Sequence, residues 1–299
     1  MKKIKFWLWI LGVLVFFAGG NQAKAFEISP VKALLTVSQG ASQTMVVKIK
    51  NSQALGSSTN FKLSVLGMKQ DEDGKPVFSR GINIAENWVY PEESLLNIKS
   101  GESGSANFII KIPDDAQAGS YYLGLAAEPT LEKNILSPQQ SGLSVRLVSL
   151  LTLEVKGLVQ ESLAIEKWTV NFADQDQNKK IKFDLNIKNS GTIETVMRGA
   201  IEVKNWRGET IFSEQTFLGN KLLADSKRVL HPEIKLKDNL NWPGIYSASI
   251  KINYGRTNQT VSAVAYIWYF PKWSKLVAGL FVLVIIGSLT FWKLKKTSF

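Results

Sequence analysis

Residues 42–52 read SQTMVVKIKNS, and residues 182–190 read KFDLNIKNS. Apolar residues occupy alternate positions in the middle of both stretches, and such alternation predicts a β-strand with one buried face. The apolar positions are Met45, Val47 and Ile49 in the first stretch, and Phe183, Leu185 and Ile187 in the second. Both stretches end in the same four residues, IKNS, which indicates two copies of one folding unit.

A second repeat supports this duplication. Gly119-Ser120-Tyr121 and Gly244-Ile245-Tyr246 each open a later alternating strand. The tyrosine of each triplet is interpreted either as a corner tyrosine, whose hydroxyl bonds an upstream backbone group, or as a core aromatic. Turn residues separate the alternating runs, and no long segment between them has apolar residues at helical spacing. The sequence therefore predicts an all-β body of two immunoglobulin-like antiparallel sandwiches, residues 26–158 and 159–271.

The distribution of charge excludes a nucleic-acid partner. The chain has 299 residues and a formal net charge of +11. Residues 1–25 carry four lysines and no acid, and residues 272–299 carry five lysines and no acid, which leaves +2 for the body between them. An electrostatic footprint for nucleic acid would need a basic body. The basic residues lie at the two ends, where we expect the chain to meet a membrane.

The amino terminus has the features of a secretory signal peptide. Lys2, Lys3 and Lys5 precede an apolar run of 13 residues, 6–18. Ala23 and Ala25 then place small residues where signal peptidase cleaves, before Phe26. We expect residues 1–25 to be removed and the rest to be exported; an uncleaved anchor is the alternative.

The carboxyl terminus predicts a transmembrane helix. Leu276–Trp292 is an uncharged stretch of 17 residues with flanking aromatic residues, and at about 1.5 Å per residue it covers roughly 26 Å. We expect a helix with its flanks at 272–293. We expect Leu276, Trp292, Lys293, Lys295 and Lys296 to anchor this helix, and residues 294–299 to form a short basic tail in the cytoplasm. The predicted location is the cytoplasmic membrane, with a single pass and the bulk of the chain outside.

Composition and motifs give no evidence of a cofactor, a metal or catalysis. The chain has no cysteine and a single histidine, His231, so disulfides, cysteine ligands and multi-histidine metal sites are excluded. Asp174–Asn178 begins like a calcium loop but lacks the glycine and the glutamate that such a loop needs. Ser29-Pro30-Val31-Lys32 matches a Ser-x-x-Lys motif, but Pro30 disfavours the helix on which that motif acts.

Three aromatic residues in polar surroundings are candidate ligand contacts: Trp88, Tyr90 and Trp206. Exposed aromatic rings stack on sugars or anchor protein partners. Partial burial under a loop is the alternative interpretation. A fourth aromatic residue, Trp168, is predicted to pack in the second core. The segment Glu128–Gly142 is predicted to be a long exposed loop and a possible contact surface.

Residues 26–51, FEISPVKALLTVSQGASQTMVVKIKN, are followed later by the strands ANFIIKIP and AGSYYLGLAAEP. This order resembles the peptidoglycan-binding first domain of WxL-interacting proteins of Gram-positive bacteria and, more distantly, immunoglobulin-like pilus chaperones. Residues 182–212 resemble the second domain of the WxL-interacting family. That family commonly has two consecutive glycines where this chain has Tyr122-Leu123-Gly124-Leu125, so one glycine matches.

The resemblance implies a protein without catalytic residues that binds cell-wall peptidoglycan and partner surface proteins. Two further functions stay open on the residues alone. One is an envelope carbohydrate-active enzyme that uses paired carboxylates. The other is an extracytoplasmic assembly chaperone that acts by strand addition, which requires an unpaired strand edge.

Overall fold

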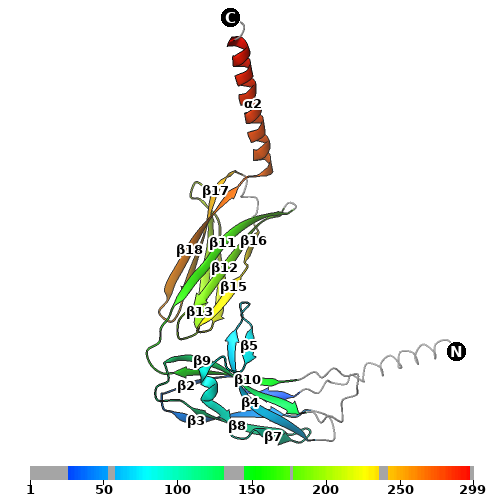
Figure 1. Cartoon of the computed structure of the whole chain (residues 1–299), viewed down its shortest axis with the longest axis vertical. Coiled ribbons are helices and arrows are strands. Elements are labelled where there is room, and N and C mark those ends of the chain that lie inside the picture. The colour runs from blue at the N-terminus through cyan, green and yellow to red at the C-terminus, as the bar shows by residue number, and fades with distance from the viewer. Residues whose placement is uncertain (1–25, 53–57, 131–144, 176–177, 236–241, 297–299) are drawn as a thin grey trace, which may run out of the picture.

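The structure, a computed structural model, describes residues 26–52, 58–130, 145–175, 178–235 and 242–296. Figure 1 shows two β-sandwiches stacked along the long axis, with a helix leaving the far end of the second. The predicted mainly-β architecture of two sandwiches is confirmed. The predicted signal peptide, with Ala23 and Ala25, lies outside the described residues, and so does most of the predicted loop Glu128–Gly142.

The first sandwich packs one sheet of strand order β1-β3-β8-β6 against another of order β2-β10-β9-β4-β5, in which β7 also pairs with β4. Its elements are β1 Glu27–Ser29, β2 Lys32–Val37, β3 Ser42–Lys50, β4 Thr59–Gln70, β5 Pro76–Ser79, the 3-10 helix η1 Ile84–Asn87, β6 Val89–Pro91, β7 Leu95–Ile98, β8 Ser103–Lys111, β9 Gly119–Thr130 and β10 Leu147–Val155. The alternation that predicted the strands also builds the core, because Ile49, Phe108 and Leu123 project between the sheets and are at most 1% exposed.

The first strand changes sheets at Pro30, whose peptide bond with Ser29 is cis. Before it, β1 pairs with β3 in antiparallel register; after it, β2 pairs with β10 in parallel, from Lys32 opposite Leu150 to Val37 opposite Val155. The prediction of purely antiparallel sheets is therefore wrong for this pair. The reason is that the chain crosses to the second sheet and then runs beside β10 in the same direction.

The second sandwich packs β11-β12-β15, with β16 also on β12, against β14-β13-β17-β18. Its strands are β11 Leu163–Gln175, β12 Asn178–Asn189, β13 Thr195–Lys204, β14 Thr210–Leu222, β15 Ser226–Leu230, β16 Glu233–Lys235, β17 Gly244–Tyr254 and β18 Gln259–Tyr269. Trp168 packs against this core as predicted: its ring stacks on Phe183 at 4.9 Å, and its indole N–H donates to the carbonyl of Ala248 at 3.0 Å. The residues 176–177 of the rejected calcium motif lie outside the described residues.

The two repeats occupy equivalent places in the two sandwiches. Asn51 and Asn189, which follow the alternating runs, are buried and donate side-chain hydrogen bonds to main-chain carbonyls: Asn51 to Ile98, and Asn189 to Ile193, Leu222 and Leu223. The Tyr121 hydroxyl donates to the carbonyl of Gln117 and the Tyr246 hydroxyl to that of Trp242, four residues upstream and at 2.9 Å in both cases. Both are corner tyrosines, and Tyr246 is also part of the core.

Helix α2 (Lys272–Lys296) follows β18 after the two-residue link Phe270-Pro271. The predicted helix at 272–293 is therefore found. Among the described residues, however, no helix is both long enough and apolar enough to cross a membrane, so the predicted span is not supported. Leu276 and Trp292 are exposed on this helix, Lys293, Lys295 and Lys296 belong to its last turn, and residues 297–299 of the predicted tail lie outside the described part.

Candidate functional site

A hairpin of the first sandwich reaches the second. The turn Asp71–Lys75 joins β4 to β5, and Gly74 takes a φ of +83° within it, a conformation that glycine adopts readily. At its tip the carbonyl of Glu72 accepts from the N–H of Val229 at 2.8 Å, and the carbonyl of Asp73 accepts from the Arg228 side chain at 3.4 Å. Figure 1 shows β5 rising towards β15 at this place. These main-chain contacts tie the two sandwiches together.

Two side chains of the first sandwich, Gln70 and Tyr122, hold the end of β14. The amide oxygen of Gln70 accepts from the N–H of Leu223 at 3.2 Å, and its amide nitrogen donates to the carbonyl of Lys221 at 3.5 Å. The hydroxyl oxygen of Tyr122 accepts from the N–H of Ala224 at 3.3 Å. Tyr122 is only 4% exposed, and burial raises the pKa of its hydroxyl to about 12. The neutral phenol is therefore part of the contact between the two sandwiches, which we name the junction.

A hollow of about 300 Å³ lies beside these contacts. Its wall is mainly apolar and is formed by both sandwiches: Ala33, Met68, Pro76, Leu150, Leu151 and Leu223. Lys32 and Lys221 add two amines, and Lys221 pairs with Glu194 at 2.5 Å. Among the described residues Lys32 has no ion-pair partner. The hollow is suited to binding an apolar group next to an anion.

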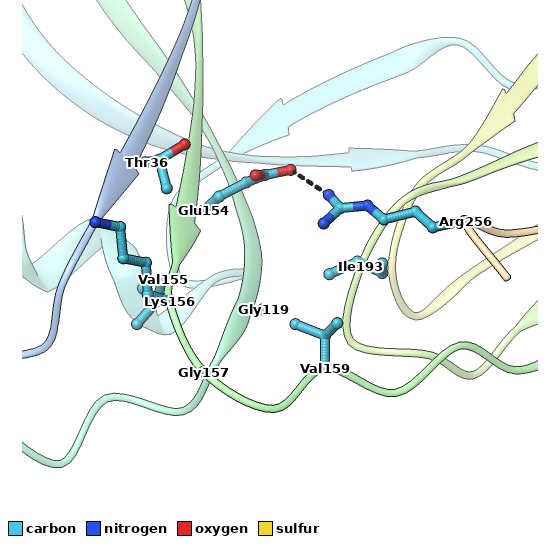
Figure 2. A pocket seen from close by; sticks show the side chains of 9 residues that line it. All are labelled: Thr36, Gly119, Glu154, Val155, Lys156, Gly157, Val159, Ile193 and Arg256. Atoms are coloured by element: carbon cyan, nitrogen blue, oxygen red, sulfur yellow. Dashed lines mark hydrogen bonds and ion pairs between the residues drawn. The ribbon is translucent and has the colours of Figure 1, made fainter.

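A second hollow, of about 210 Å³, lies beside residues 156–162, the linker between β10 and β11. Figure 2 shows Arg256, from the turn between β17 and β18, reaching across it to Glu154 of β10; their side chains are 3.0 Å apart. Val159 and Ile193 add apolar side chains to its lining. Because the charged pair bridges the hollow, this space also belongs to the contact between the sandwiches.

Glu161 of the linker fixes the turn that carries Arg256. Its carboxylate accepts from the N–H of Arg256 at 2.5 Å and from the N–H and hydroxyl of Thr257 at 3.2 and 2.6 Å. Burial alone would raise the pKa of Glu161, but these hydrogen bonds together with the Arg256 charge outweigh it and lower the pKa below its ordinary value. The linker is therefore bound to the second sandwich through an ionised carboxylate.

The described side chains show neither a metal centre nor a catalytic triad. No group of three or more histidine or acidic residues within the described ranges could hold a metal ion. The ring of His231 lies 2.8 Å from Asp184, whose other oxygen accepts from the Thr169 hydroxyl at 3.2 Å. A triad needs the hydroxyl on the imidazole, whereas here both groups bond the same carboxylate. The hydrogen bond to His231 lowers the pKa of Asp184.

β2 covers the edge of β10 only in part. The N–H of Leu150 donates to the carbonyl of Val31 at 2.8 Å, so the main-chain groups of Leu150 face β2. Backbone groups of successive strand residues point to opposite sides, and those of Val148 and Arg146 therefore face the same edge. In the described part of the chain, no strand pairs with them there.

Apolar side chains border this unpaired stretch. Val31 is 62% exposed, and Val145 is 49% exposed. Exposed edges in monomeric proteins usually carry charges or prolines that block pairing; this edge carries one charge, Arg146, whose guanidinium lies 3.4 Å from the Glu128 carboxylate. We name residues 145–149 together with Val31 the open edge.

The three predicted ligand aromatics do not lie together. Trp88 is wrong as a ligand contact, because it is 7% exposed and packs against Tyr121 with ring centroids 4.6 Å apart. Tyr90, 39% exposed, lies on β6 under the Lys111 ammonium. Trp206, 57% exposed, lies on the second sandwich with the Arg207 guanidinium 4.7 Å from its ring. The predicted cleavage residue Phe26 packs on the ring of Phe61 at 5.1 Å.

The junction residues were not predicted from the sequence. Gln70, Tyr122, Glu161 and Arg256 contact partners 95 to 153 residues away, and no local pattern marks such pairs. The repeated triplet ending at Tyr121 did point to the strand on which Tyr122 lies.

No protein-family profile matches the chain, and no curated protein sequence matches it. Among solved structures, the class 5 fimbriae chaperone CfaA is 12% identical, covers 83% of this chain and 100% of its own, and has a TM-score of 0.42. A chain of the CsuC–CsuE chaperone–tip adhesion subunit complex from Csu pili of Acinetobacter baumannii is 14% identical over 69% of this chain and 89% of that chain, with a TM-score of 0.37. A chain of the complex between the Salmonella enterica SafA pilin and the SafB chaperone is 8% identical over 84% and 99%, with a TM-score of 0.36.

These structures include pilus chaperones, the group named above as a distant resemblance, but at such identities and TM-scores they assign neither a fold family nor a function to this chain. No family profile supports the resemblance to the WxL-interacting proteins.

Proposed function

We propose that this chain is a non-catalytic extracytoplasmic protein that takes up an extended segment of another surface protein by strand addition at the open edge. The single observation that carries the proposal is the main chain of Arg146 and Val148, with which no strand in the described part of the chain pairs, and which continues the line along which β2 pairs with β10. An incoming strand would extend the sheet beyond the point where β2 leaves it.

The border of the open edge supports a protein ligand. An added strand presents alternate side chains to each face of the sheet, so specificity comes from the residues that these side chains meet. Val31 and Val145 offer exposed apolar surface there. Burying one such side chain is worth about 1.5–3 kcal/mol, so a segment with apolar residues at alternate positions would bind best.

We also propose that α2 holds the protein at a membrane, with both sandwiches on the extracytoplasmic side. Residues 280–286 of α2 run LFVLVII, and each of them is 43–68% exposed. Seven consecutive residues cover every side of a helix. Apolar surface on all sides is stable only in an apolar surrounding, and a bilayer provides one. The single-pass topology stays a sequence-based prediction.

Peptidoglycan binding also stays a sequence-based prediction. One of its three predicted aromatic contacts is in the core, and the other two lie on different sandwiches.

Site-specific photocrosslinking in intact cells tests strand addition. A photoreactive amino acid replaces Val31 in one variant and Val145 in another, and mass spectrometry maps the crosslinked peptides. We expect both positions to crosslink to one short segment of the same protein, because an added strand would pass both. Crosslinks to unrelated proteins, or to scattered segments of one protein, would contradict the proposal.

The substitution Val148→Pro tests whether capture of the partner requires main-chain pairing at the open edge. Proline removes the N–H that faces the open edge, and its ring obstructs an approaching strand, while the hydrogen bonds of Leu147 and Ser149 to β9 remain. We expect capture to fall about tenfold or more, since one backbone hydrogen bond and the contacts around it are lost. Val148→Ala keeps the N–H and should capture normally. Equal capture by both variants would exclude main-chain pairing.

A further inference from the structure

Exposed aromatic side chains gather where α2 leaves the second sandwich. We name Trp206, Trp242, Trp268, Phe270 and Trp273 the aromatic end; they are 44–67% exposed. They come from the turn after β13, the residues before β17, the end of β18 and the start of α2. Figure 1 shows that α2 leaves at the end of this sandwich that is remote from the first one.

Contacts connect these residues although the chain separates them. The rings of Trp242 and Trp273 meet edge to face at 6.1 Å, and those of Trp268 and Phe270 stack at the same distance. Trp206 lies against Gly244, where a Cβ atom would come within 3.0 Å of its ring, and Gly244 pairs with Tyr269 of β18. Three distant segments thus bring exposed aromatic rings to the base of α2, as the pair Trp242–Trp273, the pair Trp268–Phe270 and the single ring of Trp206.

The chemistry of this surface suits the headgroup layer of a bilayer. Tryptophan places an apolar ring and a polar N–H side by side, and it is enriched at membrane–water interfaces for this reason. Basic groups accompany it: the Arg207 guanidinium lies over the ring of Trp206, and Lys275 is exposed on the first turn of α2. Glu209 adds one acid in the same turn as Arg207, where it accepts from the side chain of Asn205.

The spacing along the chain fits the same layer. Trp273 precedes Leu276, the first exposed apolar residue of the uncharged stretch, by three residues, or about 4.5 Å along a helix. A headgroup layer is about 5–8 Å thick on each side of the hydrocarbon core. When the apolar part of α2 lies in hydrocarbon, Trp273 and the aromatic residues that surround it fall within the headgroup layer.

We propose that the aromatic end is a membrane seat, a surface that inserts into the headgroup layer and holds the second sandwich against the bilayer. The inference rests on the proposed insertion of α2 into a membrane. It changes the role of Trp206 from a ligand contact to a lipid contact. The first sandwich, with its open edge, is then presented away from the bilayer.

Fluorescence quenching in bilayers tests the seat. The chain has no cysteine, so single cysteines introduced into the full chain can be labelled selectively.

Trp242→Cys and Arg207→Cys place a label in the aromatic end, and Arg207→Cys retains every tryptophan. Leu283→Cys places a label on α2, and Ser262→Cys is the matched control on the same face of β18 as Trp268. The labelled chains enter nanodiscs of equal parts phosphatidylcholine and phosphatidylglycerol that carry a nitroxide on the headgroup or midway along the acyl chain.

We expect the labels at 242 and 207 to lose most of their fluorescence to headgroup nitroxides, the label at 283 to acyl-chain nitroxides, and the label at 262 to keep its fluorescence with both. Quenching at 283 with none at 242 and 207 would overturn the seat and leave the insertion of α2 intact. No quenching at 283 would overturn both. Labels at 242 and 207 that are shielded from aqueous iodide but not quenched by lipid would assign the aromatic end to a protein or glycan ligand instead.

Discussion

The two sandwiches share a core design and differ at their edges. Both bury an asparagine after the equivalent strand, and both have a corner tyrosine. In the first sandwich, β2 covers part of the last strand, β10. In the second, no described strand pairs with the outer edge of β18, although β11 packs against this strand. The outward residues Val264, Tyr266 and Trp268 of β18 are 55–72% exposed. The two interiors therefore match, while the surfaces differ: the open edge lies on the first sandwich and the exposed aromatic residues around α2 lie on the second.

The buried asparagines test the shared design, and we expect the largest effect there. Asn51→Ala and Asn189→Ala should each lower the free energy of unfolding by about 3 kcal/mol, because each leaves buried carbonyls without donors and creates a cavity. Urea denaturation of the full chain in detergent, followed by hydrogen exchange of each sandwich, measures both losses. If only one variant is destabilised, the two asparagines do not have equivalent roles.

The contact between the two sandwiches gives the second largest expected effect. Its stability should depend on pH, because Tyr122 is part of it. The folded pKa of Tyr122, about 12, exceeds the ordinary value of 10. The contribution of the neutral Tyr122 hydroxyl to the free energy of unfolding is therefore present in full below pH 10 and is lost as the pH rises towards 12. The loss amounts to about 2–3 kcal/mol.

Tyr122→Phe should flatten this alkaline loss in denaturation curves measured between pH 9 and pH 12. Part of the slope should remain, because burial also raises the pKa values of Tyr121 and Tyr246. An unchanged slope would exclude Tyr122 as a titrating group of the junction.

The corner tyrosines give a smaller, paired effect. Tyr121→Phe and Tyr246→Phe remove equivalent hydroxyls, and each should cost about 1 kcal/mol of unfolding free energy. Equal losses would show that the two tyrosine hydroxyls have equivalent roles in the two sandwiches. A loss in one sandwich alone would contradict this equivalence.

Glu161 gives the smallest expected effect, because it is only partly buried. Its pKa is lowered in the folded state, so its contribution is present above about pH 4.5, the ordinary value, and is lost as the pH falls through the folded pKa. Glu161→Gln should slightly broaden the distance distribution between the sandwiches at neutral pH, as measured by pulsed electron resonance on one spin label in each. Glu93→Gln, an exposed acid remote from the linker, should leave the distribution unchanged.

The alternation of apolar residues, together with the turn residues, predicted the two cores. Successive side chains of a strand point to opposite faces, so the burial of Ile49 and Phe183 follows from their positions in the alternating runs. The change of sheets at Pro30 was not predictable in this way: it joins Pro30 to Ser149, 119 residues away. Trp88 was misplaced for a local reason, since the capped turn at Ile84–Asn87 carries it from polar surroundings into the core. The aromatic end needed three segments to meet in space, so the sequence marked only the part next to α2.

Hydrogen exchange at the open edge tests the central claim most directly. The amides of Leu147 and Ser149 face β9, and that of Leu150 donates to Val31, so they should exchange slowly in the free full-length chain and in its complex with the crosslinked partner. The account predicts that the amides of Arg146 and Val148 exchange fast in the free chain and become protected in the complex. Fast exchange at both positions in the complex would contradict strand addition.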